Sequence, residues 1–346
     1  MANAAANRRS LRLGTRGSQL ARWQAEWVAD QLRRLGETVE LIEIATRGDV
    51  ERAAAIEEIG TRGVFAKEIQ RALLAGDVDL GVHSLKDLPT EPVDGLTLAA
   101  VPPRESAADV LVMSARSEER GARREDQEGL FHSSLPTPHS PLPIPRSSLL
   151  APRSLLPIGA RVGTGSLRRQ AQLRHVRPDL QTLDIRGNVD TRLRKLDEGQ
   201  FDAIVLAEAG LRRLGLADRA TQILPFEVML PAVGQGALAI ECRADDAQTL
   251  SALAPLEDPV TRAGVTAERA LLAHLRGGCM APVGAWGRVE NGVLHLSALV
   301  LSADGAQRLS ANGSATVEDA QTLGRQVADS LLGQGAGELI AAARKS

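Results

Sequence analysis

The sequence is poor in the residues on which several classes of protein depend. It has no tyrosine, only 2% aromatic residues, two cysteines in 346 residues and a formal net charge of −2. Nucleic-acid binding usually needs a basic surface and aromatic stacking platforms, so this composition argues against it. Two cysteines cannot form a disulfide framework, and no cysteine or histidine spacing fits a metal site. We therefore expect a cytoplasmic protein without a structural metal.

Long apolar runs are also missing. Nowhere do about 18 apolar residues follow one another, and the N-terminal "MANAAANRRS" has no apolar segment for a signal peptide. We expect neither export nor a membrane span. The sequence does contain 43% hydrophobic and 24% charged residues, which is typical of a globular protein with two or three domains.

Apolar periodicity predicts two α/β units of similar size, without a fixed-period repeat, and then a smaller domain. Strand, helix, strand at this spacing favours a parallel sheet wrapped by helices. Strands are expected at 11–16, 39–46, 78–84, 160–164, 180–185, 201–207, within 230–242, and near 284–289 and 293–301. Helices are expected from Ser18 to Gly36, over 64–76, from Ser166, and over 189–199, 265–278 and about 320–332.

Residues 115–157 interrupt this pattern. They begin with a charged stretch and continue with a proline-rich one, "SSLPTPHSPLPIPRSSLLAPRSLLP", that has no periodicity. Proline at this density blocks helix and removes backbone donors, so we expect an exposed, mobile insertion. A docking site for a proline-recognising partner is the alternative.

A polar group follows one predicted apolar strand in "VHSLKDLP", which contains His83, Ser84, Lys86 and Asp87. Ligands bind at the carboxyl ends of strands in open parallel sheets. A carboxylate beside a lysine could be a general acid or base, or could stabilise a developing cation. An ordinary polar turn is the alternative, and for His83 a hydrogen-bonded strand residue.

Arginines gather at other strand ends. In "GTGSLRR" a turn of small residues precedes a helix whose first turn carries Arg168 and Arg169, and there both backbone N–H groups and guanidinium forks attract anions. Three further arginines and one serine occupy similar places: Arg16, Ser18, Arg186 and Arg192. Solvated helix faces are the alternative. No phosphate loop or dinucleotide fingerprint occurs, and "VGQGA" predicts either a hinge or a tight turn.

Cys279 lies in "LRGGCMAPVG", where two glycines and a proline predict a loop rather than a regular element. A thiol in such a loop is open to covalent attachment or to nucleophilic catalysis. Cys242 ends an apolar strand and is expected to be inert.

Taken together, "VHSLKDLP", "GTGSLRRQ", "LDIRGNVDTRL", "LPAVGQGALAIE" and "LRGGCMAPVG" resemble the porphobilinogen deaminase (hydroxymethylbilane synthase) family, in order, from about Leu11 to the C-terminus. The resemblance implies two lobes like those of periplasmic binding proteins and a third α/β domain that presents the cysteine. It implies lobe 1 at 9–107 with 231–257, lobe 2 at 108–230 and a C-terminal domain at 258–346. It also favours a monomer, and the composition argues against nucleic-acid or membrane partners.

The resemblance further implies a chemistry: four porphobilinogen molecules joined head to tail, with loss of ammonia, on a covalent dipyrromethane cofactor. Asp87 matches the catalytic aspartate and Cys279 the cofactor anchor. The other cofactor contacts implied are Ser84, Lys86, Thr164, Ser166, Arg168, Arg169 and Arg186, and the substrate contacts are Arg16, Ser18 and Arg192. Gly165 and Arg62 depart from the family pattern, which commonly has serine and lysine there. A binding protein without chemistry is the competing hypothesis, but it would need neither Asp87 nor Cys279.

Overall fold

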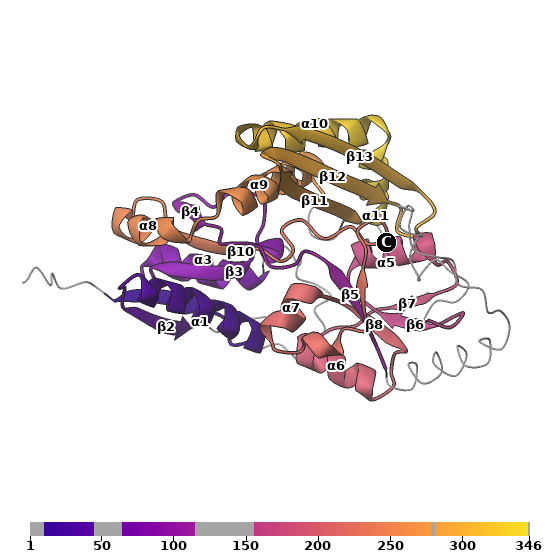
Figure 1. Ribbon diagram of the computed structural model, residues 1–346, viewed down its shortest axis with the longest axis horizontal. Coiled ribbons are helices and arrows are strands. Elements are labelled where there is room, and N and C mark those ends of the chain that lie inside the picture. The colour runs from indigo at the N-terminus through magenta and orange to yellow at the C-terminus, as the bar shows by residue number, and fades with distance from the viewer. Residues whose placement is uncertain (1–9, 45–63, 115–155, 278–280, 345–346) are drawn as a thin grey trace, which may run out of the picture.

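The computed structural model describes residues 10–44, 64–114, 156–277 and 281–344. Cys279, Arg62 and all but the last two residues of the predicted insertion lie outside the described residues. Three sheets organise the described chain, and each belongs to one lobe or domain (Figure 1).

Lobe 1 is built on a five-stranded sheet with the order β2-β1-β3-β10-β4. Its strands are β1 (Leu11–Thr15), β2 (Val39–Glu43), β3 (Leu80–Ser84), β4 (Leu96–Ala100) and β10 (Leu238–Arg243). Helix α1 (Gln19–Arg34) buries Val28 and Leu32 on one face of the sheet together with α8 (Ala247–Leu253). Helix α3 (Val64–Ala75) buries Ile69 and Leu73 on the other face. Successive strand side chains point to opposite faces, so one sheet supports both cores.

Lobe 2 repeats this plan with the strand order β7-β6-β8-β5-β9. Its strands are β5 (Asp109–Met113), β6 (Arg161–Gly163), β7 (Gln181–Leu183), β8 (Ala203–Ala207) and β9 (Gln222–Leu224). Its helices are α5 (Leu167–Val176), α6 (Val189–Asp197) and α7 (Glu208–Arg213). Leu111 packs in the core that contains Leu173 of α5, whereas its neighbour Val110 packs in the core that contains Leu193 of α6.

Both sheets are mixed rather than wholly parallel, which corrects the expectation from strand and helix spacing. Strand β1 is parallel to β2 and β3, and β6 is parallel to β7 and β8, as predicted. Strands β10 and β5, however, run antiparallel to both of their neighbours. Each begins beside the carboxyl end of a neighbouring strand, with Leu238 opposite Ser84 and Asp109 opposite Ala207. The chain therefore crosses between the lobes at that end, so the entering strand must run backwards.

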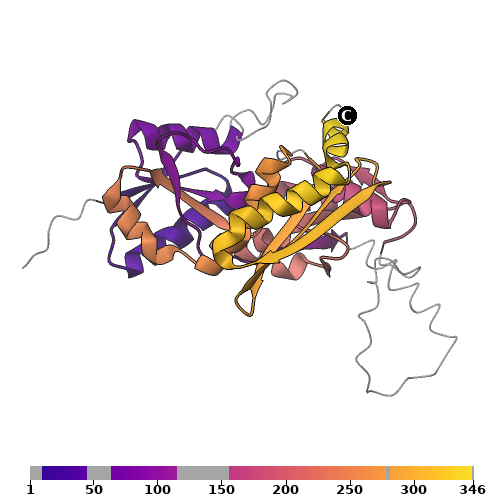
Figure 2. The ribbon, with the colours of Figure 1, turned by 90° about the horizontal axis from the view of Figure 1, so that it is seen from above.

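The C-terminal domain has an antiparallel sheet of β11 (Val283–Glu290), β12 (Val293–Leu301) and β13 (Arg308–Ala315). It is covered by α9 (Pro259–His274), α10 (Ala320–Gly333) and α11 (Ala336–Ala343), whose buried side chains share one core with the sheet. Helix α9 begins earlier than predicted because Pro259 opens it and the Asp258 side chain accepts from the Thr261 N–H. The domain lies across both lobes (Figure 2).

Single 3₁₀ turns also occur among the described residues. They are η1 (Leu85–Asp87), η2 (Ala217–Arg219), η3 (Ala254–Leu256) and η4 (Val317–Asp319). The predicted α/β architecture with two like lobes and a smaller C-terminal domain is confirmed.

Candidate active site

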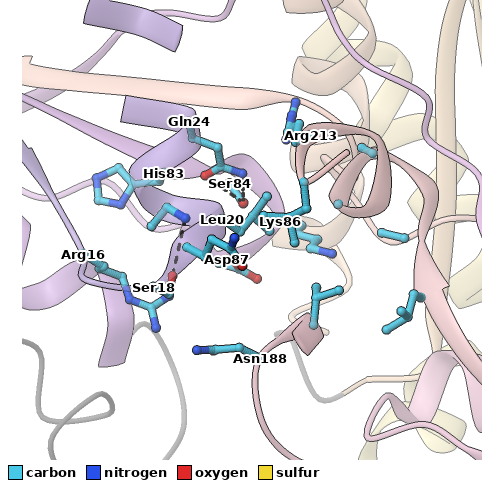
Figure 3. Close-up of a pocket in the computed structure, with 18 of the residues that line it drawn as sticks. Arg16, Ser18, Leu20, Gln24, His83, Ser84, Lys86, Asp87, Asn188 and Arg213 are labelled. Atoms are coloured by element: carbon cyan, nitrogen blue, oxygen red, sulfur yellow. Dashed lines mark hydrogen bonds between the residues drawn. The ribbon is translucent and has the colours of Figure 1, made fainter. Parts of the chain in front are cut away.

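A cavity of about 300 Å³ lies between the two lobes. Strand ends and helix starts from both lobes line it, as the carboxyl-end rule for α/β sheets predicts. Figure 3 shows Lys86 and Asp87 near the centre of the view, with Arg16 of lobe 1 to their left and Asn188 of lobe 2 below them. The polar lining residues are Arg16, Ser18, Gln19, Gln24, His83, Ser84, Lys86, Asp87, Arg169, Asn188, Asp190, Arg192 and Arg213.

The lobe 1 wall is held by local hydrogen bonds. The Ser18 side chain accepts from the Ala21 N–H and so caps α1, as predicted. One turn further along α1, Gln24 Nε2 donates to Ser84 Oγ at 2.9 Å. This bond ties α1 to the end of β3, where the predicted acid–base group begins.

Asp87 stands at the end of the turn η1. The turn is anchored by the Leu85 N–H, which donates to the Ala237 carbonyl at 3.0 Å, and by the Leu85 side chain, which is buried. The Asp87 side chain is exposed to the cavity, whereas Lys86 is half-buried. Burial lowers the pKa of Lys86 to about 8, against the opposing attraction of Asp87. An exposed carboxylate is thus set beside an ammonium group that has been partly stripped of water.

Across the cavity, Arg168 and Arg169 share one carboxylate, that of Asp109 at the start of β5. Arg168 Nη1 donates to Asp109 Oδ2 at 2.7 Å, and Arg169 Nη2 donates to Asp109 Oδ1 at 2.7 Å. Asp109 is fully buried, and the two guanidinium groups hold its pKa well below the ordinary range. Two positive charges on one negative charge leave a buried excess of positive charge beside the cavity.

Arg169 and Arg168 nevertheless occupy different places. Arg169 lines the cavity, whereas Arg168 is directed to the Leu230 carbonyl as well as to Asp109 and is absent from the lining described above. Arg192 lines the cavity and donates through Nε to the Gly187 carbonyl at 2.7 Å. Burial lowers the pKa of Arg192 to about 10, and the nearby charges of Arg169 and Arg186 add to this effect.

The structure thus brings together many of the residues singled out by sequence. Those that line the cavity are Arg16, Ser18, Ser84, Lys86, Asp87, Arg169 and Arg192. Those placed outside its lining are Thr164, Ser166, Arg168 and Arg186. Thr164 is buried, with its Oγ1 accepting from the Ser166 N–H at 3.3 Å, and exposed Arg186 donates to Asp184 at 2.7 Å.

Gly165 has a steric explanation. A Cβ atom at this position would lie 3.0 Å from both Asp184 Oδ1 and the Ile185 carbonyl oxygen. A serine there would have to push these atoms back, so the departure from the family pattern fits the close approach of the segment that carries Arg186.

Several lining residues escaped prediction. Arg213 is buried, donates to the Gly236 carbonyl at 2.6 Å and lies over the Trp23 ring at 5.9 Å. Burial lowers the pKa of Arg213 to about 10. Its position in the short helix after β8 follows the same strand-end rule that identified the other arginines, so "LAEAGLRR" held the signal. Gln24 and Asn188 carried none beyond ordinary polarity.

The described part of the chain gives no support for metal binding, for a reactive Cys242 thiol or for a membrane-spanning helix. The described residues include no cluster of three histidine, cysteine or acidic side chains that could hold a metal ion. Cys242 is buried, and burial raises the pKa of its thiol to about 11, which agrees with the inert role expected. Within these same ranges, no helix has the length and apolar character needed to cross a membrane.

Most of this chain is similar in sequence to known protein families and to individual known proteins. Residues 11–135 and 143–251 match the family model described as "Porphobilinogen deaminase, dipyromethane cofactor binding domain", and residues 263–333 match "Porphobilinogen deaminase, C-terminal domain". Porphobilinogen deaminase of Desulforudis audaxviator is 46% identical over 339 residues, covering 97% of this chain and 99% of the relative. That of Syntrophotalea carbinolica is 44% identical over 335 residues, covering 96% of each.

Solved structures with a similar fold are more distant. An ancestral cationic amino acid solute-binding protein is 14% identical with a TM-score of 0.38, covering 71% of this chain and 87% of the other. The periplasmic aliphatic sulphonate binding protein of Escherichia coli is 15% identical with a TM-score of 0.35, covering 77% and 70%. The extent of the two family models and of the sequence identity decides the assignment: this chain belongs to the porphobilinogen deaminase family.

Proposed function

We propose that the cavity between the lobes is where this chain acts as a hydroxymethylbilane synthase, with Asp87 as its catalytic carboxylate. The reaction joins four porphobilinogen molecules head to tail on the cofactor, with release of one ammonia for each, and hydrolysis by water then releases the linear tetrapyrrole from the cofactor. The observation that carries the assignment of the site is the exposed Asp87 carboxylate set among Lys86, Arg16, Arg169 and Arg192 in one cavity.

The charges suit the substrate. Each porphobilinogen brings two carboxylates and one aminomethyl group, so a site for it needs several cations and one separate anion. Arginine is suited to carboxylates because its fork can donate two parallel hydrogen bonds. Arg16 from lobe 1 and Arg169 and Arg192 from lobe 2 supply such forks on both sides of the cavity.

The residues also fit the family's dipyrromethane cofactor, which is linked through a thioether. The excess of positive charge around Asp109 and the lowered pKa of Arg192 are both relieved when acidic side chains bind beside them. We assign the anchor to Cys279, and the carboxylate contacts to Lys86 and Arg169, which line the cavity. When bound, the cofactor supplies a pyrrole carbon on which the chain can grow.

Asp87 has two tasks in this proposal. The aminomethyl group of the substrate is an ammonium ion near neutral pH, so when its C–N bond breaks the electron pair leaves with nitrogen as neutral ammonia. The positive charge left on the substrate is stabilised by a carboxylate that is fixed beforehand, without reorganisation. The new C–C bond then forms, and the proton released from the attacking pyrrole carbon can pass to the same carboxylate.

We also propose the domain division expected from sequence, with lobe 1 at 9–107 and 231–257, lobe 2 at 108–230 and the C-terminal domain at 258–346. Support comes from the sheets, since β10 joins lobe 1 after the chain has passed through lobe 2. A cytoplasmic monomer is proposed on the scarcity of cysteine and on the resemblance of the chain to its family.

Replacing Asp87 by asparagine tests the role of the carboxylate. Asp87→Asn keeps the side-chain volume but removes the charge and the proton acceptor, so kcat for porphobilinogen should fall about 10²- to 10⁴-fold. Asp94→Asn, at an exposed site of lobe 1, serves as the matched control and should turn over normally. Intact mass would show whether each variant carries the cofactor. A cofactor-loaded Asp87→Asn variant with the turnover of the unaltered chain would overturn the role.

A further inference from the structure

Helix α9 of the C-terminal domain touches the turn that carries Asp87. Val265 of α9 packs in the same buried cluster as Leu85, the first residue of the turn, and Leu88, which follows the turn. One helical turn later, Arg269 reaches the main chain just after Asp87: Nη1 donates to the Leu88 carbonyl at 3.1 Å and Nη2 to the Pro89 carbonyl at 2.7 Å. Residues four apart lie on one helix face, so Val265 and Arg269 form a single docking face.

The helix itself is held firmly by its neighbours. Gly264 packs directly on the backbone of Gly287 in β11, where a Cβ on Gly264 would lie 2.8 Å from the Gly287 carbonyl oxygen. Glu268 is fully buried, and its carboxylate accepts from Arg104 Nη1 at 2.6 Å and from the Gly234 N–H at 2.6 Å. Helix α9 therefore cannot shift without breaking buried contacts, either with its own sheet or with the segments around Arg104 and Gly234 that cross between the lobes.

The sequence beyond α9 gives this docking face its significance. The helix ends at His274, and Cys279 follows shortly afterwards along the chain. One rigid element thus contacts the Asp87 turn with its middle and leads directly into the segment that contains the predicted anchor cysteine. A guanidinium that grips two successive carbonyls fixes both the position and the orientation of the turn, which an apolar contact alone would not do.

We propose that Arg269 is a positioning residue. Together with Val265 it fixes the position of the Asp87 turn relative to the C-terminal domain, so that the Asp87 carboxylate is correctly placed against each substrate. This role rests on the proposed function of Asp87. Arg269 touches neither substrate nor cofactor in this scheme. Its loss should let the turn relax, and misplacement of a catalytic group by about 1 Å can cost about 100-fold in rate.

Arg262 provides a matched control on the same helix. It also joins α9 to lobe 1, since Nη2 donates to the Leu98 carbonyl at 3.2 Å and Nε to Glu257 at 2.6 Å, but it does so at β4 rather than at the Asp87 turn. Arg262→Met and Arg269→Met each remove a guanidinium that docks α9 on a lobe 1 carbonyl. A merely structural role for Arg269 predicts similar behaviour of the two variants.

The experiment compares full-length, cofactor-loaded variants by thermal unfolding, intact mass and steady-state kinetics with porphobilinogen. For Arg269→Met we expect kcat to fall about 10- to 100-fold while KM changes less than about threefold. Arg269→Lys, which can reach one carbonyl but not both, should recover part of kcat. Arg262→Met should keep the kcat of the unaltered chain while its melting temperature falls by a similar amount.

Equal kcat for loaded Arg269→Met and Arg262→Met would overturn the positioning role. If Arg269→Met does not fold, Arg269→Lys and Val265→Ala decide the question: kcat lowered at constant KM supports the role, and unchanged kcat in both refutes it. Failure of the unaltered, loaded chain to turn over porphobilinogen would instead overturn the proposed function, and this role with it.

Discussion

Asp109 shows how a single buried carboxylate can organise a site without lining it. Two arginines donate to it, and Gln235 Nε2 from the returning crossover donates to Oδ1 at 2.8 Å. The aspartate thereby joins the start of β5, the start of α5 and the segment that leads into β10. Its charge is neutralised within the fold, which leaves Arg169 held in place at the cavity wall.

Removing that carboxylate should be costly. Asp109→Asn leaves two buried guanidinium groups without their counter-ion, so we expect the free energy of unfolding in urea to fall by about 3–5 kcal/mol. Asp197→Asn, which breaks the exposed Asp197–Arg219 pair of the same lobe, is the control and should cost no more than about 1 kcal/mol. Equal losses for the two variants would contradict the description of Asp109 as a buried counter-ion.

The buried Asp109 carboxylate also predicts a pH dependence of the protein's stability with a definite sign. Because the folded-state pKa of Asp109 lies below its unfolded value, the carboxylate contributes stability above an ordinary aspartate pKa, and this contribution is lost as the pH falls below it. The urea stability of Asp109→Asn should therefore respond less to acidification below about pH 4 than that of the unaltered chain.

At this scale the sequence predicted exposed and strand-end groups better than buried ones. Asp87 and Arg169 follow a visible rule, since both stand beside strand ends in polar segments. Asp109 was missed because "AADVLVM" looks like an apolar strand with one polar end. Its role as a buried counter-ion depends on partners far along the chain. Arg168 looked equivalent to Arg169, but helix geometry turns adjacent residues about 100° apart, and only Arg169 reaches the cavity lining.

Among the elements, the turn between β12 and β13 joins the C-terminal domain to lobe 2. Arg174 Nη1 donates to the Ala303 carbonyl at 2.8 Å, and His175 Nδ1 lies 2.8 Å from the Gly305 carbonyl oxygen. Phe226 and Trp286 add an aromatic contact across the same interface, with ring centroids 4.0 Å apart. The turn thus rests on α5, the helix whose first turn holds Arg169.

Gly305 allows this close contact. Its φ is +78°, and a Cβ would lie 2.7 Å from both the Ala171 carbonyl oxygen and the backbone nitrogen of His175. Gly305→Ala should therefore push the turn away from α5 and destabilise the protein by about 1–3 kcal/mol beyond the backbone cost. Gly292→Ala isolates that cost, because Gly292 has the same φ of +78° with nothing within 4 Å of its Cβ. Thermal unfolding of the two variants gives the difference, and no difference would mean that the turn does not bear on α5.

Several elements with strong apolar periodicity were predicted, but strands β4, β5, β9 and β13 and helices α7, α8 and α11 were not. Helices α1 and α3 and strands β1 to β3 follow from local pattern alone. Strand β13, "RLSANGSA", has too little apolar character to be recognised, and it forms because its backbone pairs with β12 along its whole length. The reversed direction of β5 and β10 could not be read locally, since it depends on where the chain crosses between lobes.

The likeness of the two lobes extends to side-chain contacts that become visible only in three dimensions. Arg12 of β1 donates through its backbone N–H and its guanidinium to Asp79, just before β3. Arg161 of β6 makes the equivalent bonds to Asp202, just before β8. No repeat of fixed period links these segments in the sequence, yet the same arginine–aspartate pair joins the second and third strands in the order of each sheet.

At the scale of the whole molecule, the C-terminal domain contacts both lobes and the segments that cross between them. It holds the Asp87 turn through Arg269, the crossover segments through Glu268, and α5 through the turn at Gly305. Its resting place across both lobes, seen in Figure 2, puts its helix α9 in contact with the wall of the cavity where the chemistry is proposed to occur. A family resemblance predicted the domain, but these contacts had to come from the structure.

If this chain builds tetrapyrrole on a cofactor anchored at Cys279, that cysteine carries two linked pyrrole units, which intact mass with peptide mapping around Cys279 can detect. We predict a mass increase equal to two linked pyrrole units, located on the peptide that contains Cys279, in the purified protein or after incubation with porphobilinogen. A Cys279 peptide that remains unmodified after that incubation would contradict the claim, and a binding protein without chemistry would then be the better description.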